Sequence, residues 1–108
     1  MLLDEIEEGG VEVLDSRALA DIVHEYEALL VADNTFLSPH FQKPLDLGAD
    51  IVVESGTKYL CGHNDVICGF LAVKDAESDL AKELELLVKS EGPNLSPMDS
   101  WLMLRSLK

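Results

Sequence analysis

The chain has 108 residues, of which 47% are hydrophobic and 27% are charged, and this composition excludes a disordered acidic tail. Its 21 acidic residues outnumber its eight lysines and arginines, which leaves a formal net charge of −13. Because such a surface repels phosphate groups, we expect neither nucleic acid nor a membrane as a partner. A chain of this length holds at most one domain.

The sequence shows no sign of export or membrane insertion. No apolar run approaches the roughly 20 residues of a membrane-spanning helix, and the first residues lack the cationic stretch of a secretory signal. Cys61 and Cys68 are too few for a disulfide framework. We therefore expect a cytoplasmic protein with reduced thiols.

The first half of the chain alternates helical and extended patterns. Residues 1–14 form an acidic lead-in, with one helical turn expected over 2–8 and an extended stretch over 11–14. Asp15 is an N-cap residue for a helix with an apolar stripe at helical spacing, made of Leu19, Ile22, Val23 and Tyr26. Residues 29–32 are apolar on both faces, which is typical of a strand buried between layers of helices.

The second half repeats this alternation. A short helix over 44–47 ends at Gly48, and strands are expected over 51–53 and 67–73. Asp75 caps the next helix, whose apolar stripe is Leu80, Leu84, Leu87 and Val88. The last helix begins after Ser96, with a proline and then an acidic residue in its first turn.

Alternating helices and doubly buried strands predict an α/β fold with a mostly parallel sheet. Three strands are too few to close such a layer, because the outer strands would expose apolar faces. The last helix also runs to the end of the chain at Lys108. We therefore interpret the chain as a piece of a larger fold.

Polar residues follow two of the expected strands at the sheet edge where α/β proteins bind ligands. Asp33 follows one strand, and the run Ser55, Gly56, Thr57 and Lys58 follows the next. A carboxylate keeps a ring nitrogen protonated, hydroxyl groups bind phosphate, and a desolvated lysine forms a Schiff base. Together these groups describe a site for pyridoxal 5′-phosphate (PLP).

Each of these residues also has a plainer interpretation. An aspartate after a strand commonly forms a turn, and a lone lysine is usually a solvated surface charge. Two other site types are excluded, because the chain contains neither a phosphate-binding P-loop nor a G-x-S-x-G nucleophile elbow.

Five segments decide between these interpretations. They are ADNTF at 32–36, GADIVV at 48–53, SGTKYL at 55–60, GHND at 62–65 and SPMDSWL at 96–102. In this order they resemble the Cys/Met-metabolism family of PLP-dependent enzymes. These are the trans-sulfuration enzymes, which include cystathionine γ-synthase and the cystathionine β- and γ-lyases.

The resemblance implies a domain organisation and an activity. Residues 15–95 would form part of a three-layer α/β/α PLP-binding large domain, of the aspartate aminotransferase-like fold type I. Residues 96–108 would begin the helix that leads to a C-terminal domain absent from this chain. The activity would be β- or γ-elimination or replacement on cystathionine or a homoserine ester, in methionine and cysteine metabolism. The family also implies a small amino-acid substrate and a homo-oligomer, the family's homotetramer.

The resemblance also assigns roles to individual residues. Lys58 would bind PLP covalently as an aldimine and, once released, move the substrate's proton. Asp33 would pair with the pyridinium nitrogen, and Ser55 and Thr57 would bind the phosphate. The two residues after Asp33 would support it.

The chain departs from the family pattern at three positions. Gly56 replaces the usual alanine, Glu54 stands where many relatives have histidine, and Cys61 stands where a glycine or small residue is common. Parts that stack on the ring and grip the substrate carboxylate are also missing, so we expect the segment alone to be inactive.

Two alternatives stay open. One is a non-catalytic remnant that serves in assembly. The other is a small metal-binding module, built on the pattern C-x-H-x-D-x-x-C over residues 61–68. We expect no metal there, because structural zinc sites usually pair C-x-x-C knuckles.

Overall fold

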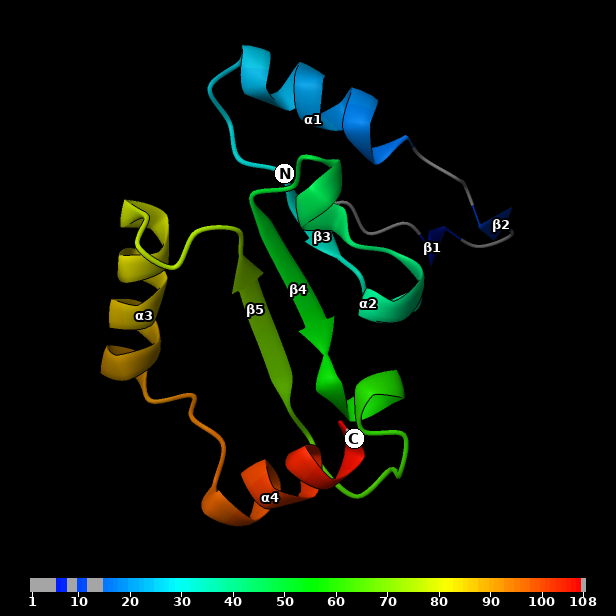
Figure 1. The fold of residues 1–108 in the computed structure, drawn as a ribbon, viewed down its shortest axis with the longest axis vertical. Coiled ribbons are helices and arrows are strands. Elements are labelled where there is room, and N and C mark those ends of the chain that lie inside the picture. Colours follow the sequence, from blue (N-terminus) through cyan, green and yellow to red (C-terminus); the bar gives the residue numbers. More distant parts are fainter. Residues whose placement is uncertain (1–5, 8–9, 12–14, 108) are drawn as a thin grey trace.

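The computed structural model describes residues 6–7, 10–11 and 15–107. Its elements, in chain order, are β1 (Ile6–Glu7), β2 (Gly10–Val11), α1 (Ser16–Glu25), β3 (Val31–Asp33), α2 (Ser38–Phe41), the 3-10 helix η1 (Pro44–Leu47), β4 (Ile51–Ser55), the π-helical turn η2 (Gly56–Leu60), β5 (Gly69–Val73), α3 (Asp79–Glu91) and α4 (Pro97–Ser106) (Figure 1). The helical turn expected near the start is replaced by a strand over 6–7, which pairs with β2, and the rest of that turn lies outside the described residues.

A three-stranded sheet forms the centre of the molecule, in the order β3-β4-β5 (Figure 1). Strand β3 runs parallel to β4, with Asp33 opposite Val53. Strand β5 runs antiparallel to β4, with Gly69 opposite Ser55, so only one of these two pairings is parallel as expected. The reason is the connection between β4 and β5. A parallel neighbour needs a crossover to the other end of the sheet, whereas η2 and the loop after it start β5 at the same end where β4 stops.

One core cluster joins α1 to the sheet. The Asp15 carboxylate caps α1 as expected, accepting from the amides of Arg17 at 3.0 Å and Ala18 at 3.2 Å. The buried residues of this cluster are Ala20, Val23, Leu30, Ala49 and Val52. Gly48 allows α1 to approach, because a Cβ atom at this position would lie 2.7 Å from that of Ala20.

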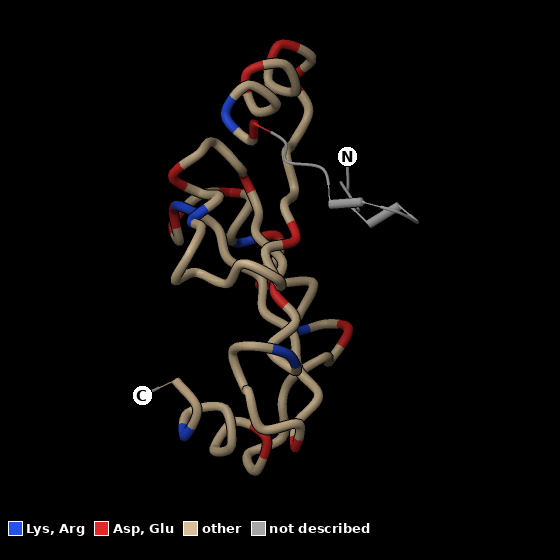
Figure 2. Tube along the Cα trace, turned by 90° about the vertical axis from the view of Figure 1, so that its right-hand side faces the viewer, with Lys and Arg blue, Asp and Glu red and all other residues tan. Residues whose placement is uncertain are grey.

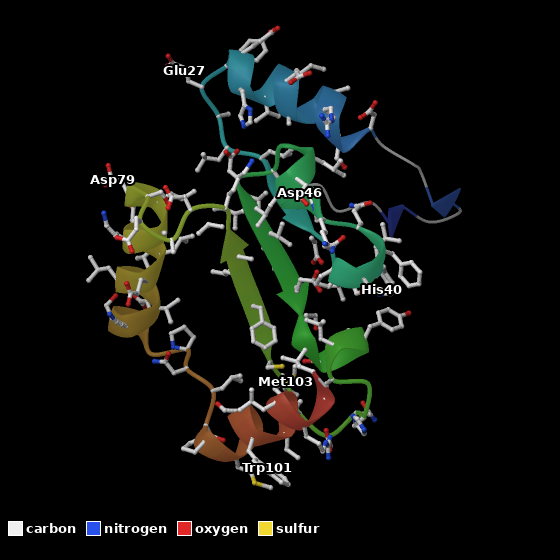
Figure 3. All side chains as sticks on the ribbon, viewed as in Figure 1. Glu27, His40, Asp46, Asp79, Trp101 and Met103 are labelled. Atoms are coloured by element: carbon white, nitrogen blue, oxygen red, sulfur yellow. The ribbon has the colours of Figure 1, made fainter. Side chains whose placement is uncertain are left out.

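A second core cluster joins α4 to the far end of the sheet. Its buried residues are Cys61, Val66, Cys68 and Met103, and Phe70 packs against them. Figure 3 shows Met103 on the side of α4 that faces the sheet, with Trp101 pointing outward. Trp101 is 59% exposed. Helix α4 is thereby packed against the segment that follows β4.

Several apolar surfaces stay uncovered. Strand β5 is an outer strand of the sheet and is largely exposed, as expected for the outer strands, and α3 buries none of its residues. An open groove of about 480 Å³ lies between these two elements. The radius of gyration is 15.0 Å, against about 13 Å for a compact chain of this length. This open arrangement agrees with the interpretation as part of a larger fold.

Acidic residues are spread along the chain from α1 to α4 (Figure 2), and in the sequence they outnumber the basic ones. No helix in the described ranges is both long and apolar enough to cross a bilayer.

Candidate functional site

The ends of β3 and β4 lie side by side, so the two candidate loops meet. The amide of Ser55 donates to Thr35 Oγ1 at 2.8 Å, which joins the end of β4 to the loop after β3. The rings of Phe36 and Tyr59 lie 6.4 Å apart, which adds a second contact between the loops. The strand ends that carry Asp33 and Ser55 are therefore parallel neighbours, as the site requires.

Asp33 ends β3 with an exposed carboxylate. Its Oδ1 atom accepts from the amide of Thr35 at 2.9 Å, and this bond turns the chain away from the sheet. Within the described residues, neither a hydrogen bond nor an ion pair occupies Oδ2. The carboxylate is thus oriented locally and still has an oxygen available for a ligand.

A buried polar pair lies next to Asp33. Asn34 is 2% exposed, and its Nδ2 donates to Gln42 O at 3.0 Å and to Glu54 Oε1 at 2.8 Å. Glu54 is 5% exposed. Burial raises the pKa of Glu54; the Asn34 hydrogen bond opposes this shift, and the Asp33 charge adds to it. Sequence reasoning named Asn34 as a support but noted Glu54 only as a departure from the family pattern.

Thr57 is tied to the start of β5. Its Oγ1 accepts from the Cys68 amide at 2.9 Å and donates to the Cys68 carbonyl at 3.2 Å. The Thr57 amide also donates to that carbonyl, at 3.2 Å. The sequence offered no signal for this contact, because the partner lies 11 residues away, in the loop just before β5.

Lys58 lies in the middle of η2 with an exposed side chain. Its backbone leaves helical geometry, at φ −88° and ψ −115°, so the turn is kinked at this residue. Gly56 begins the turn in a tight space, where a Cβ atom would lie 2.5 Å from Cys68 Sγ and 2.6 Å from Phe70 Cε2. The glycine that replaces the family's usual alanine therefore fits these two neighbours.

The residues of the possible metal pattern make other contacts. Cys61 Sγ donates to Asp65 Oδ1 at 3.3 Å, and Arg105 Nη2 donates to Asp65 Oδ2 at 2.9 Å. The Arg105 guanidinium, and then the Cys61 thiol, lower the pKa of Asp65. His63 Nδ1 lies 3.2 Å from Ser106 Oγ. These contacts attach α4 to the loop after η2, and the described part of the chain holds no cluster of three or more potential metal ligands.

The donor set fits PLP in part. The adjacent ends of β3 and β4 carry a carboxylate at Asp33 and a half-buried hydroxyl group at Ser55, and η2 directly after β4 carries the exposed Lys58. The hollow between β5 and α3 and a second one between α1 and η1 include none of these residues. The candidate residues therefore lie outside both of these hollows.

Curated relatives match most of this chain. The cystathionine γ-lyase of Dictyostelium discoideum is 52% identical over 98 residues, which are 91% of this chain and 25% of that enzyme. The chloroplastic cystathionine β-lyase of Arabidopsis thaliana is 46% identical over 97 residues, which are 90% of this chain and 20% of that enzyme. The chain thus spans about a fifth to a quarter of the length of these relatives.

Solved structures agree with the sequence matches. Yeast cystathionine γ-lyase superimposes with a TM-score of 0.88 at 39% identity, over 98% of this chain and 28% of that one. Cystathionine γ-synthase from Xanthomonas oryzae pv. oryzae gives 0.84 at 44% identity, over 90% of this chain and 24% of that one. The expected fold, part of a fold type I large domain, is confirmed. The sequence model of the family described as Cys/Met metabolism PLP-dependent enzyme matches residues 2–108, and the chain belongs to that family.

Proposed function

We propose that the protein carrying this segment catalyses β- or γ-elimination or replacement on cystathionine or a homoserine ester. Relatives named cystathionine γ-lyase, β-lyase and γ-synthase support this reaction class. The structural observation that carries the proposal is the bond from the Ser55 amide to Thr35 Oγ1, which holds the two candidate loops together. The substrate would be a small amino acid, processed in methionine and cysteine metabolism.

In this proposal each site residue has a separate task. PLP, when bound, supplies an electron sink for the substrate's reacting bonds. The free oxygen of Asp33 would keep the ring nitrogen protonated, and the Ser55 hydroxyl would bind the phosphate. Lys58 would hold the cofactor covalently through Nζ and would accept the proton taken from the substrate. Its exposed position on the kinked turn leaves Nζ able to reach a ligand.

Thr57 can bind phosphate without giving up its structural role. The Cys68 amide donates to a lone pair of Thr57 Oγ1, and that bond is independent of where the hydroxyl proton points. The proton now donated to the Cys68 carbonyl can turn to a phosphate oxygen instead. The carbonyl keeps a donor after this change, because the Thr57 amide also donates to it.

Other parts of the protein must complete this function. The segment spans about a quarter of the length of its relatives, so we propose that the segment alone is inactive and works within a homo-oligomer, the family's homotetramer. Residues 15–95 would belong to the large domain, and 96–108 would lead to a C-terminal domain. Cytoplasmic placement stays a prediction, since one relative is the chloroplastic enzyme of Arabidopsis thaliana.

Trapping of PLP on the chain tests the proposal. PLP is added, the adduct is reduced with borohydride, and the labelled peptide is identified by mass spectrometry. We expect label on Lys58, its loss in Lys58→Ala, and its retention in Lys43→Ala, which removes another exposed lysine. The same measurements are made on a chimera in which residues 15–107 replace the matching part of the Dictyostelium discoideum enzyme.

Label spread over several lysines, or absent from Lys58 in both folded samples, would overturn the proposal. The second of these results would favour the alternative of a non-catalytic remnant that serves in assembly.

A further inference from the structure

Two buried polar atoms next to Asp33 lack hydrogen-bond partners. Among the described residues, Asn34 Oδ1 and Glu54 Oε2 are both buried and unpaired. The other polar atoms of the two side chains are paired, because Asn34 Nδ2 donates to Glu54 Oε1 at 2.8 Å. If Glu54 is ionised, both unpaired atoms are acceptors, and neither can satisfy the other.

The orientation of the Asn34 amide is determined by its surroundings. Its Nδ2 also donates to the Gln42 carbonyl at 3.0 Å, and a carbonyl oxygen can only accept. Exchanging the nitrogen and oxygen of the amide would place two acceptors against each other at Gln42. The unpaired atom of Asn34 is therefore its oxygen, and it needs a donor.

We propose that Glu54 is a neutral carboxylic acid in the folded protein, over a pH range in which exposed glutamates are ionised. Its Oε2–H donates to Asn34 Oδ1, and this bond closes a ring with the existing bond from Asn34 Nδ2 to Glu54 Oε1. A single proton thus gives both buried, unpaired atoms a partner.

The charges around Glu54 favour the same state. In the described ranges the ion pairs join His24 to Asp50, Lys89 to Glu85 and Arg105 to Asp65, so no cation pairs with Glu54. On one side Asp33 ends the neighbouring strand β3, and its negative charge disfavours a second one. On the other side the β5 partner of Glu54 is Phe70, which carries no charge. Burial raises the pKa of Glu54 further.

A neutral Glu54 has a consequence for the site, and this part rests on the proposed function. Of the two carboxyl groups, Asp33 and Glu54, only Asp33 is then negatively charged. The ring nitrogen would therefore interact with one carboxylate, that of Asp33. The acid–amide ring also holds Asn34, whose backbone amide donates to Val53 O at 2.9 Å and ties the residue after Asp33 to β4. Glu54 is thus a positioning residue that acts through Asn34.

The test is an infrared pH titration of the carboxylic acid C=O band. It uses this chain and the chimera with the Dictyostelium discoideum enzyme, both without cofactor and both checked for folding by circular dichroism. We expect a protonated-acid band with a midpoint above the ordinary glutamate value of 4.5. The band is lost in Glu54→Gln and retained in Glu25→Gln, which changes an exposed acid on α1.

Stability provides a second measurement. Glutamine can make both bonds to Asn34, whereas leucine makes neither, so Glu54→Gln should keep the urea midpoint and Glu54→Leu should lower it. Because folding raises the pKa of Glu54, the contribution of Glu54 to stability is complete below pH 4.5. This contribution is lost as pH rises through the pKa that Glu54 has in the folded protein. The Gln variant should lack this part of the pH dependence.

Two results would overturn the inference: a Glu54 band that titrates at or below 4.5 in the folded chimera, or a band that persists in Glu54→Gln. Labelling of Lys58 with PLP in the same samples keeps the two proposals apart. Label without the acid band removes this inference alone, and the acid band without label removes the proposed function alone.

Discussion

Replacing Gly56 with alanine should strain the turn that carries Lys58. The new Cβ atom would lie 2.5 Å from Cys68 Sγ and 2.6 Å from Phe70 Cε2, both closer than side-chain carbons normally approach. Cys68 cannot move away easily, because it is 8% exposed and its amide donates to Thr57 Oγ1 at 2.9 Å. Overpacking of this kind costs about 1–3 kcal/mol.

Urea denaturation followed by circular dichroism measures this cost. For a slope of about 1–3 kcal/mol per molar urea, a loss of about 2 kcal/mol lowers the midpoint by roughly 1 M. Gly69→Ala is the matched control, because its Cβ would lie 3.6 Å from the Glu54 carbonyl oxygen, an ordinary contact. We expect Gly69→Ala to shift the midpoint much less than Gly56→Ala.

A double variant tests the cause of the strain. Cys68→Ala removes the sulfur atom that the new Cβ would meet at 2.5 Å, so Gly56→Ala should cost less in that background. Contacting residues typically couple by about 0.5–3 kcal/mol. Equal midpoints for Gly56→Ala and Gly69→Ala, or no coupling to Cys68, would refute the close packing described here.

Three further predictions concern the whole segment and its C-terminal contact. Exposed apolar side chains such as Leu71, Leu87 and Trp101 should make the isolated chain self-associate, and a monodisperse monomer in sedimentation velocity would contradict this. The isolated chain should turn over cystathionine negligibly, because the loss of substrate positioning raises the activation barrier by roughly 7–11 kcal/mol. Rapid release of pyruvate or 2-oxobutyrate would contradict this prediction. In Arg105→Ala the lowered pKa of Asp65 should rise toward 3.8 in an NMR titration. In the wild type, the stability contributed by the Asp65–Arg105 pair is present above pH 3.8 and is lost as pH falls through the pKa of Asp65 in the folded protein. An unchanged Asp65 titration in the variant would rule out the Arg105 guanidinium as the cause of the lowered pKa.

Helix ends were predictable where the capping residue lies beside the helix in sequence. Asp15 caps α1, and Ser96 Oγ accepts from the Asp99 amide at 3.1 Å at the start of α4. At α3 the prediction was wrong, because Ser78 rather than Asp75 is the N-cap. Asp75 instead accepts from the Glu77 amide in the preceding turn. Both residues are suitable caps, and sequence spacing did not distinguish between them.

For the strands, the sequence predicted position better than burial and direction. Strand β4 was expected over 51–53 and is buried at Ile51 and Val52, as its apolar run predicts. Strand β5 has a similar run but exposes most of its residues and pairs antiparallel. Apolar composition indicates that a strand requires cover, but it determines neither what provides the cover nor in which direction the strand runs.

By itself, the sequence determined the alternation of helices and strands, the family resemblance and the candidate residues Asp33, Ser55, Thr57 and Lys58. These features depend on residue type and on spacing along one segment. Only the tertiary structure decided that Thr57 bonds to Cys68, that Gly56 leaves room for its neighbours, and that Asn34 meets Glu54. Each of these contacts joins segments that are distant in sequence, 11 to 20 residues apart for the two hydrogen-bonded pairs, so it exists only after the strands have paired in register.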